Sequence, residues 1–210
     1  MKRITSAYII LTALCALPFV ACDDEKDPVE TMYSGFMTGF TDSEGYISVL
    51  NDDFGKQYMV NEKSEQLDPD TLYRIVASVA LDENRTARIL QMASTMSYVA
   101  PNDSIIPDSM RKKDPIEIHS VYIGGGYLNI YAGIKVQKEG TRHSLFYSRL
   151  NSNGKAAFTI YHNAYGDGQV YTKHAYISIP LHGYDLAKND TVSLTCHGYQ
   201  EDYDYKLIYK

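Results

Sequence analysis

The chain has 210 residues, with 20 Lys and Arg against 26 Asp and Glu, so its formal net charge at pH 7 is −6. An acidic chain without a run of Lys or Arg repels phosphate backbones, which argues against nucleic-acid binding. Tyr is common, with 19 residues, and Trp is absent. Tyr suits a half-buried pleated surface, so this bias favours strands.

Residues 1–21 have the pattern of a bacterial export signal: a positive start, then an uncharged and largely apolar stretch. Small Ala21 directly precedes Cys22, which resembles the lipobox of bacterial lipoproteins, although Phe19 stands where Leu is usual. The resemblance implies cleavage before Cys22 and a lipid on its sulfur, so the membrane is the first expected partner. The alternative is an uncleaved spanning segment, which a proline near the end of the stretch disfavours.

Residues 22–30 are acidic and cannot bury themselves, so we expect an extended tether. The segment is similar to the acidic export signal that follows the cysteine in surface-exposed lipoproteins of some Gram-negative anaerobes. We therefore expect a lipid-anchored protein of the outer membrane that faces the cell exterior, with the periplasmic face as the alternative.

Residues 31–100 read as short strands between turn signals, and five antiparallel strands of this length predict a small OB-like barrel. The last segment, Arg85–Met96, contains good helix formers, but a tight turn after a long strand favours a hairpin partner. The earlier strands are expected at Tyr33–Thr41, Tyr46–Asn51, Lys56–Val60 and around Tyr73–Leu81.

Residues 101–114 contain many polar residues and two prolines, so they predict a linker or an inter-domain crossing. From residue 115 to 210 apolar and polar residues alternate cleanly, and about seven strands predict an antiparallel β-sandwich. The clearest apolar faces are Leu128–Val136, Ala175–Leu181 and Val192–Cys196.

Three stretches carry a resemblance to a known family: Asp114-Pro115-Ile116, the run IGGGYLNI at Ile123–Ile130 and the run HNAYGD at His162–Asp167. Together they resemble the NigD-like lipoprotein family. That resemblance implies an N-terminal OB-type barrel followed by a C-terminal β-sandwich. It implies no activity, so no catalytic residue is carried over.

Two loops invite a functional reading. Gly124-Gly125-Gly126 precedes a strand rather than a helix, so we expect a bend or bulge with close backbone approach instead of a phosphate cradle. The second loop, with His162, Asn163, Tyr165 and Asp167, is either a capped turn or a binding loop. Turn chemistry explains its composition, and polar loops on rigid scaffolds often bind ligands.

All six histidines lie in the expected sandwich, without the local spacing of a metal site, so we predict no metal and no cofactor. His174 and His197 could meet across a sheet, but scattered surface histidines are the simpler interpretation. Cys196 lies on the apolar side of its strand and is expected to be a core residue.

The sequence predicts no catalytic residues, because no nucleophile stands on a strained turn. The adjacent carboxylates Asp52-Asp53 and Glu201-Asp202 read as solvated turns. We therefore expect a non-enzymatic surface lipoprotein with a protein or envelope partner. The alternatives are a glycan-binding module that stacks sugars on Tyr, which the absence of Trp weakens, and a secreted hydrolase.

Overall fold

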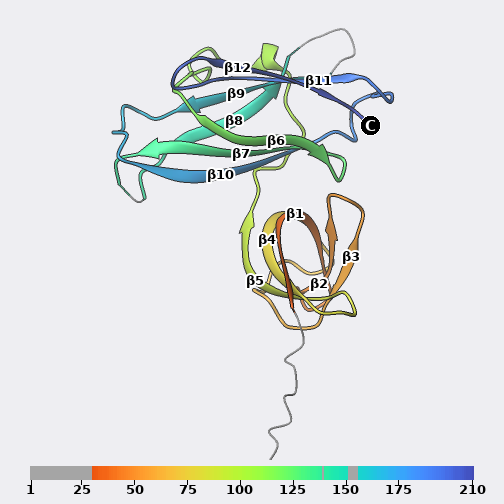
Figure 1. Ribbon diagram of the computed structural model, residues 1–210. Coiled ribbons are helices and arrows are strands. Elements are labelled where there is room, and N and C mark those ends of the chain that lie inside the picture. The colour runs from red at the N-terminus through yellow and green to blue at the C-terminus, as the bar shows by residue number, and fades with distance from the viewer. Residues whose placement is uncertain (1–29, 139, 151–155) are drawn as a thin grey trace, which may run out of the picture.

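The computed structural model describes residues 30–138, 140–150 and 156–210. The expected export signal, Cys22 and the tether up to residue 29 lie outside the described residues. Within these ranges the chain forms strands and one short 3₁₀ helix, η1 (Figure 1). The elements are β1 Thr31–Thr41, β2 Ile47–Asp52, β3 Gln57–Val60, β4 Leu72–Leu81, β5 Thr86–Ser94, η1 Asp103–Ile105, β6 Glu117–Gly124, β7 Tyr127–Val136, β8 Ser144–Arg149, β9 Ala157–Asn163, β10 Tyr171–Pro180, β11 Thr191–His197 and β12 Asp202–Ile208.

The first five strands close into a barrel in the order β1-β2-β3-β5-β4. β1 pairs with β4 along its length and closes the barrel, while β3 runs parallel to β5. The predicted small barrel is confirmed, and so is the strand β5, whose residues also suit a helix. The expectation of wholly antiparallel pairing is wrong at β3–β5. Closure buries the apolar inward side chains, including Met37, Ile47, Leu50 and Val79.

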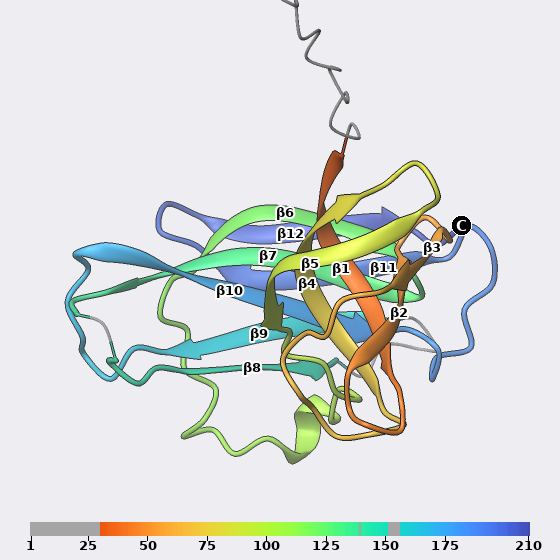
Figure 2. The same cartoon turned by 90° about the horizontal axis from the view of Figure 1, so that it is seen from below.

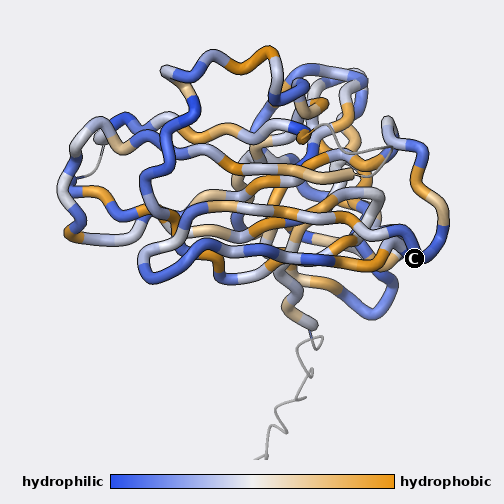
Figure 3. The backbone as a smooth tube through the Cα atoms, turned by 90° about the horizontal axis from the view of Figure 1, so that it is seen from above, coloured by the Kyte–Doolittle hydropathy of each residue, from blue (hydrophilic) through white to orange (hydrophobic). Residues whose placement is uncertain are grey.

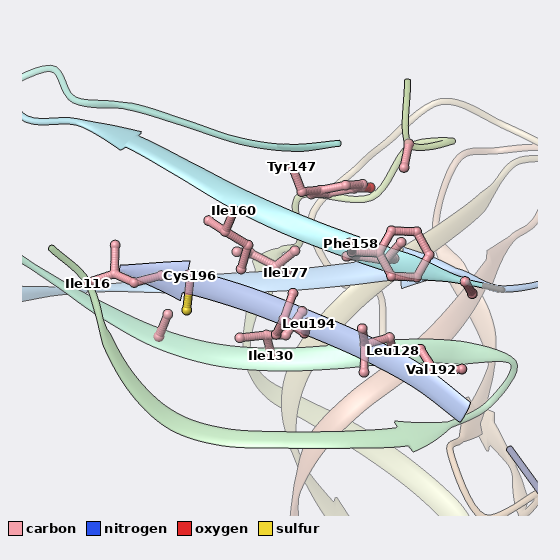
Figure 4. Close-up of a cluster of buried hydrophobic side chains, with 14 of the residues drawn as sticks. Ile116, Leu128, Ile130, Tyr147, Phe158, Ile160, Ile177, Val192, Leu194 and Cys196 are labelled. Carbon is pink, nitrogen blue, oxygen red and sulfur yellow. The ribbon is translucent and has the colours of Figure 1, made fainter. Parts of the chain in front are cut away.

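The other seven strands of the described chain form two packed sheets, in the orders β10-β7-β6 and β12-β11-β9-β8. Pairing is antiparallel except between β11 and β9. The predicted sandwich is confirmed, because the apolar faces of the two sheets meet in one core (Figure 4). Leu128, Ile130, Ile177 and Leu194 lie fully buried in that core.

The alternation in the sequence decides which face of each strand is buried. In β7 the residues Leu128, Ile130 and Ala132 are inaccessible, whereas Tyr127 and Tyr131 are half-buried on the opposite face. Colouring by hydropathy shows the same alternation of apolar and polar residues along the strands (Figure 3). The outer face of β10-β7-β6 is therefore where side chains remain free to meet another surface.

The barrel packs against that outer face and covers only part of it (Figures 1 and 2). The connection is short: β5 ends at Ser94, and Met96 already forms a parallel bridge with Ile177 of β10. The amide of Met96 donates to the carbonyl of Tyr176 at 2.8 Å, and its carbonyl accepts from the amide of Ser178 at 3.0 Å. The two modules are thus joined by backbone pairing as well as by packing.

Residues 101–114, expected to be a linker or a crossing, run along the sandwich. Bridges join Asn102 to Arg149 and Lys113 to His162. The Asp103 carboxylate accepts hydrogen bonds from the hydroxyls of Ser148 at 2.7 Å and Tyr161 at 2.9 Å. The polar residues of this segment therefore form contacts with the four-stranded sheet β12-β11-β9-β8. No helix in the described part of the chain is long and apolar enough to span a membrane.

Candidate functional site

A buried ion pair holds the barrel against the sandwich. Arg74 of β4 donates to Asp53, in the turn after β2, at 2.6 Å, and their side chains are only 3% and 1% exposed. The same guanidinium donates to the Asn129 carbonyl at 2.9 Å and to the Ser178 hydroxyl at 2.8 Å. Arg74 therefore joins the barrel to two strands of the sandwich.

The remaining polar atoms of this network are also paired. The second carboxylate oxygen of Asp53 accepts from the Tyr122 hydroxyl at 2.8 Å and from the Asn129 amide at 2.9 Å. Burial and this hydrogen bond raise the pKa of Tyr122 well above its ordinary value. Ser178 completes the network by donating to Asn129 at 2.6 Å. A buried network with every member satisfied fixes one geometry of the two modules.

The prediction of a solvated turn at Asp52-Asp53 is wrong for both residues. Asp52 is 5% exposed and accepts the amides of Phe54 and Lys56, which caps the turn. It also accepts a hydrogen bond from the Tyr58 hydroxyl at 3.0 Å, and burial together with this hydrogen bond raises the pKa of Tyr58 to about 12. Asp53 is covered by the sandwich, and no local sequence pattern predicts this burial. The other pair, Glu201-Asp202, is exposed as expected.

The glycine run forms the β6–β7 turn, and the expectation of a bend with close backbone approach is confirmed. Gly125 and Gly126 have φ of 60° and 84°, as a two-residue hairpin turn requires. A Cβ on Gly125 would lie 2.4 Å from the Asp53 carboxylate, so only glycine lets the turn reach the ion pair.

Beside the ion pair, an aromatic cleft of about 510 Å³ opens between the barrel and the sheet β10-β7-β6. A volume of this size is typical of ligand pockets, which often lie between domains. Phe36 of β1 meets Tyr122 and Tyr176 edge-on, with ring centroids 6.1 and 6.2 Å apart. We call this hollow the junction cleft; its lining residues are Tyr33, Ser34, Gly35, Phe36, Phe54, Val76, Ser120, Tyr122, Tyr131 and Tyr176.

The sheet face continues beyond the cleft with polar rings. Tyr131 and Tyr176 are cross-strand partners whose rings stack at 5.2 Å and 17°. The Tyr131 hydroxyl lies 2.9 Å from Nδ1 of His174, and its ring lies 4.7 Å from that of His119. The aromatic row is thus bordered by two imidazoles on the uncovered end of the sheet.

The loop at residues 162–167, predicted to be a capped turn or a binding loop, is held by burial and by hydrogen bonds within the protein. His162 is 3% exposed, and Asn163 accepts the amide of Tyr165 at 2.9 Å. Asp167 accepts the amide of Gln137 at 2.9 Å. Tyr165 has φ of 52° and is 69% exposed. Three of these four residues therefore hold the loop, and Tyr165 is the one that faces solvent.

His162 and Asp167 are also linked through His143. Nδ1 of His162 faces the carbonyl of Pro115 at 3.1 Å and must donate. Nε2 of His162 lies 2.9 Å from Nδ1 of His143, and Nε2 of His143 lies 3.1 Å from Asp167. These hydrogen bonds join Pro115, His162, His143 and Asp167 in one continuous chain.

The shifts of pKa agree with this arrangement. Burial lowers the pKa of His162, and the neighbouring His143 lowers it further. The amide of Gln137 and the imidazole of His143 lower the pKa of Asp167. The group is a closed, buried structural network, and sequence reasoning missed it because His143 directly precedes β8 whereas His162 lies on the neighbouring β9.

The other candidates stay apart. His174 lies on β10 and His197 on β11, in different sheets, so the alternative in which they meet across a sheet is wrong. His197 instead contacts Asp202. Cys196 is a core residue as expected, and burial raises the pKa of its thiol to about 12. Among the described residues no group of three or more His, Cys, Asp or Glu is arranged to hold a metal ion.

Comparisons with known proteins find relatives that share this architecture. The model of the NigD-like C-terminal beta sandwich domain matches residues 99–209. A NigD-like immunity protein from Bacteroides caccae is 25% identical, with a TM-score of 0.68 over 82% of this chain and 91% of that one. A protein described as toxin-related from Parabacteroides distasonis is 19% identical, with a TM-score of 0.67 over 86% and 94%.

A protein of unknown function from Bacteroides vulgatus is 14% identical, with a TM-score of 0.66 over 86% of this chain and 92% of that one. Likenesses at this level of identity concern the fold. No curated protein sequence matches. Because the family model covers more than half of the chain, including the glycine turn and the loop at residues 162–167, the chain belongs to the NigD-like family.

Proposed function

We propose that the protein is a non-enzymatic binding protein of the bacterial cell envelope, anchored by a lipid on Cys22. The junction cleft is the observation that carries the binding role. Its lining residues include no carboxylate, imidazole, amine or thiol among the described side chains. A surface of aromatic rings and hydroxyls can hold a ligand, and this lining supplies no base that would activate a Ser or Tyr hydroxyl as a nucleophile.

The rigid junction supports the same role. Arg74 and Asp53 fix the barrel wall of the cleft relative to the sheet, so little order has to be gained when a ligand binds. The relative named as an immunity protein also supports a binding role over a catalytic one. Anchoring, and the outer face of the outer membrane as its location, rest on the lipobox and the acidic segment after Cys22.

Two measurements test this proposal. Cys22→Ala should move the protein from the membrane to the soluble fraction, and protease treatment of whole cells should degrade the wild-type protein. A retained membrane position for Cys22→Ala would refute the anchor, and protection from protease would refute the outward orientation.

The binding role has its own test. The mature chain with Cys22→Ala should bind envelopes isolated from the producing bacterium, and the further changes Phe54→Ala and Tyr176→Ala should abolish that binding. Tyr165→Ala, in the loop at residues 162–167, is the matched control. Loss of binding in the control alone would move the binding site from the cleft to that loop.

A further inference from the structure

Tyr176 occupies a special place on the sheet face. Its ring stacks on that of Tyr131 and lies at 82° to that of Phe36, with the centroids 6.2 Å apart. Contacts from two modules therefore fix its orientation before any ligand arrives. Fixed aromatic rings bind flat apolar surfaces at a low cost in side-chain entropy.

The hollow does not end at this ring. Val76 and Tyr176 also line a second hollow of about 340 Å³, which continues past Ser78, Gln91 and Met92. The junction cleft and this second hollow thus meet at Tyr176. Such a trough suits an extended ligand of several similar units better than a single compact molecule.

Hydroxyl and imidazole groups border the aromatic rings. The hydroxyls of Ser34 and Ser78 lie 2.7 Å apart at the exposed margin, and Ser120 is exposed on the opposite side. Beyond Tyr131 follow His174 and His119. Neutral donors and acceptors around flat rings complement a sugar, whose C–H face is apolar and whose edge carries hydroxyls.

The charges and the strand pairing argue against other occupants. The lining of the junction cleft has no charged residue within the described chain, so a charged ligand would lose its hydration without a partner. β1, β4 and β7 each pair on both sides, and Met96 already pairs with the edge of β10 at Tyr176 and Ser178, so the backbone beside Tyr176 offers no free edge to which a peptide strand could add.

We propose that the trough formed by the junction cleft and the second hollow binds a neutral oligosaccharide, with one sugar ring in contact with Tyr176. The proposal rests on the binding role assigned above and names the chemical class of its ligand. It requires no cofactor and no covalent step.

The test starts with the mature chain carrying Cys22→Ala on an array of neutral oligosaccharides of plant, fungal and animal type. At least one neutral glycan should bind, and Tyr176→Ala should weaken that binding at least tenfold. Phe54→Ala gives a second variant that cannot disturb packing, because Phe54 is 77% exposed. Tyr165→Ala should bind like the unchanged protein.

The absence of Trp provides a direct readout of the contact. Tyr176→Trp introduces a single tryptophan, which can be excited apart from the tyrosines, and its emission should shift when the bound glycan is added, whereas that of Tyr165→Trp should not. No binding to any neutral glycan, or binding that Tyr176→Ala leaves unchanged, would overturn the proposal. If envelope binding still depends on the cleft, only the ligand class is refuted; if it does not, the binding role at the cleft fails as well.

Discussion

Removal of the Arg74 guanidinium should strongly destabilise the protein. Arg74→Met keeps much of the aliphatic volume but leaves the Asp53 carboxylate buried without its cation, and deprives Asn129 and Ser178 of a donor. Breaking a buried pair in this way costs about 3–5 kcal/mol. For a folded chain of this size each kcal/mol lowers the melting temperature by roughly 2–4 °C, so the loss should be on the order of 10 °C.

Urea unfolding followed by circular dichroism measures this loss, with Arg88→Met as the control. Arg88 forms an ion pair of 2.8 Å with Glu30, but their side chains are 39% and 43% exposed. The control should therefore lose less than about 1 kcal/mol. The double variant Arg74→Met with Asp53→Asn should lose less than the sum of the two single variants, by about 1–3 kcal/mol.

Two results would contradict this reasoning. A loss for Arg74→Met no larger than that of Arg88→Met would mean that water reaches the pair. Additive losses in the double variant would mean that Arg74 and Asp53 stabilise the junction independently, and the description of one network would be wrong.

Three further predictions concern single sites. Gly125→Ala should cost at least about 2 kcal/mol in urea unfolding, more than Gly126→Ala, because both strain a positive φ but only the first meets the Asp53 carboxylate; equal losses would contradict the close approach. Since burial holds the pKa of His162 below 6.5, the unfolded chain binds a proton that the native chain does not, and the free energy of unfolding should fall as the pH drops from about 7.5 to about 5.5. His162→Gln should remove part of that fall, and an unchanged slope would argue against a neutral buried His162. In the mature chain with Cys22→Ala, Cys196 should react with a thiol reagent only after unfolding, because its buried thiol has a raised pKa; rapid reaction of the native protein would contradict its burial.

The sandwich could be predicted because its strands obey a period of two. The alternation along Leu128–Val136 places its apolar side chains on one fully buried face, whereas Tyr131 and Lys135 on the opposite face are half-buried. The barrel was likewise predictable from short strands and turn residues. The parallel pairing of β3 with β5 was not, since a pattern within each strand says nothing about the direction of its neighbour.

The junction was harder to predict, because it depends on contacts between distant segments. Asp53 sits among polar turn residues, and nothing nearby signals a second module above it. One indication was available in β4: its face away from the barrel core carries Leu72, Arg74, Val76, Ser78 and Ala80, and three of these five are apolar. A strand with apolar residues on both faces is covered on both sides, as β4 is here.

The pairing of Met96 with β10 has a mechanical consequence. Met96 pairs with the edge strand β10 only two residues after β5 ends, and Arg74 donates a hydrogen bond to Ser178 of the same strand. The junction between barrel and sandwich therefore contains no flexible hinge. The first described residues leave the barrel at the pole opposite the sandwich (Figure 1). An attachment at that end of the barrel therefore moves the barrel, the cleft and the sandwich as one rigid body, and it sets the direction in which the cleft opens.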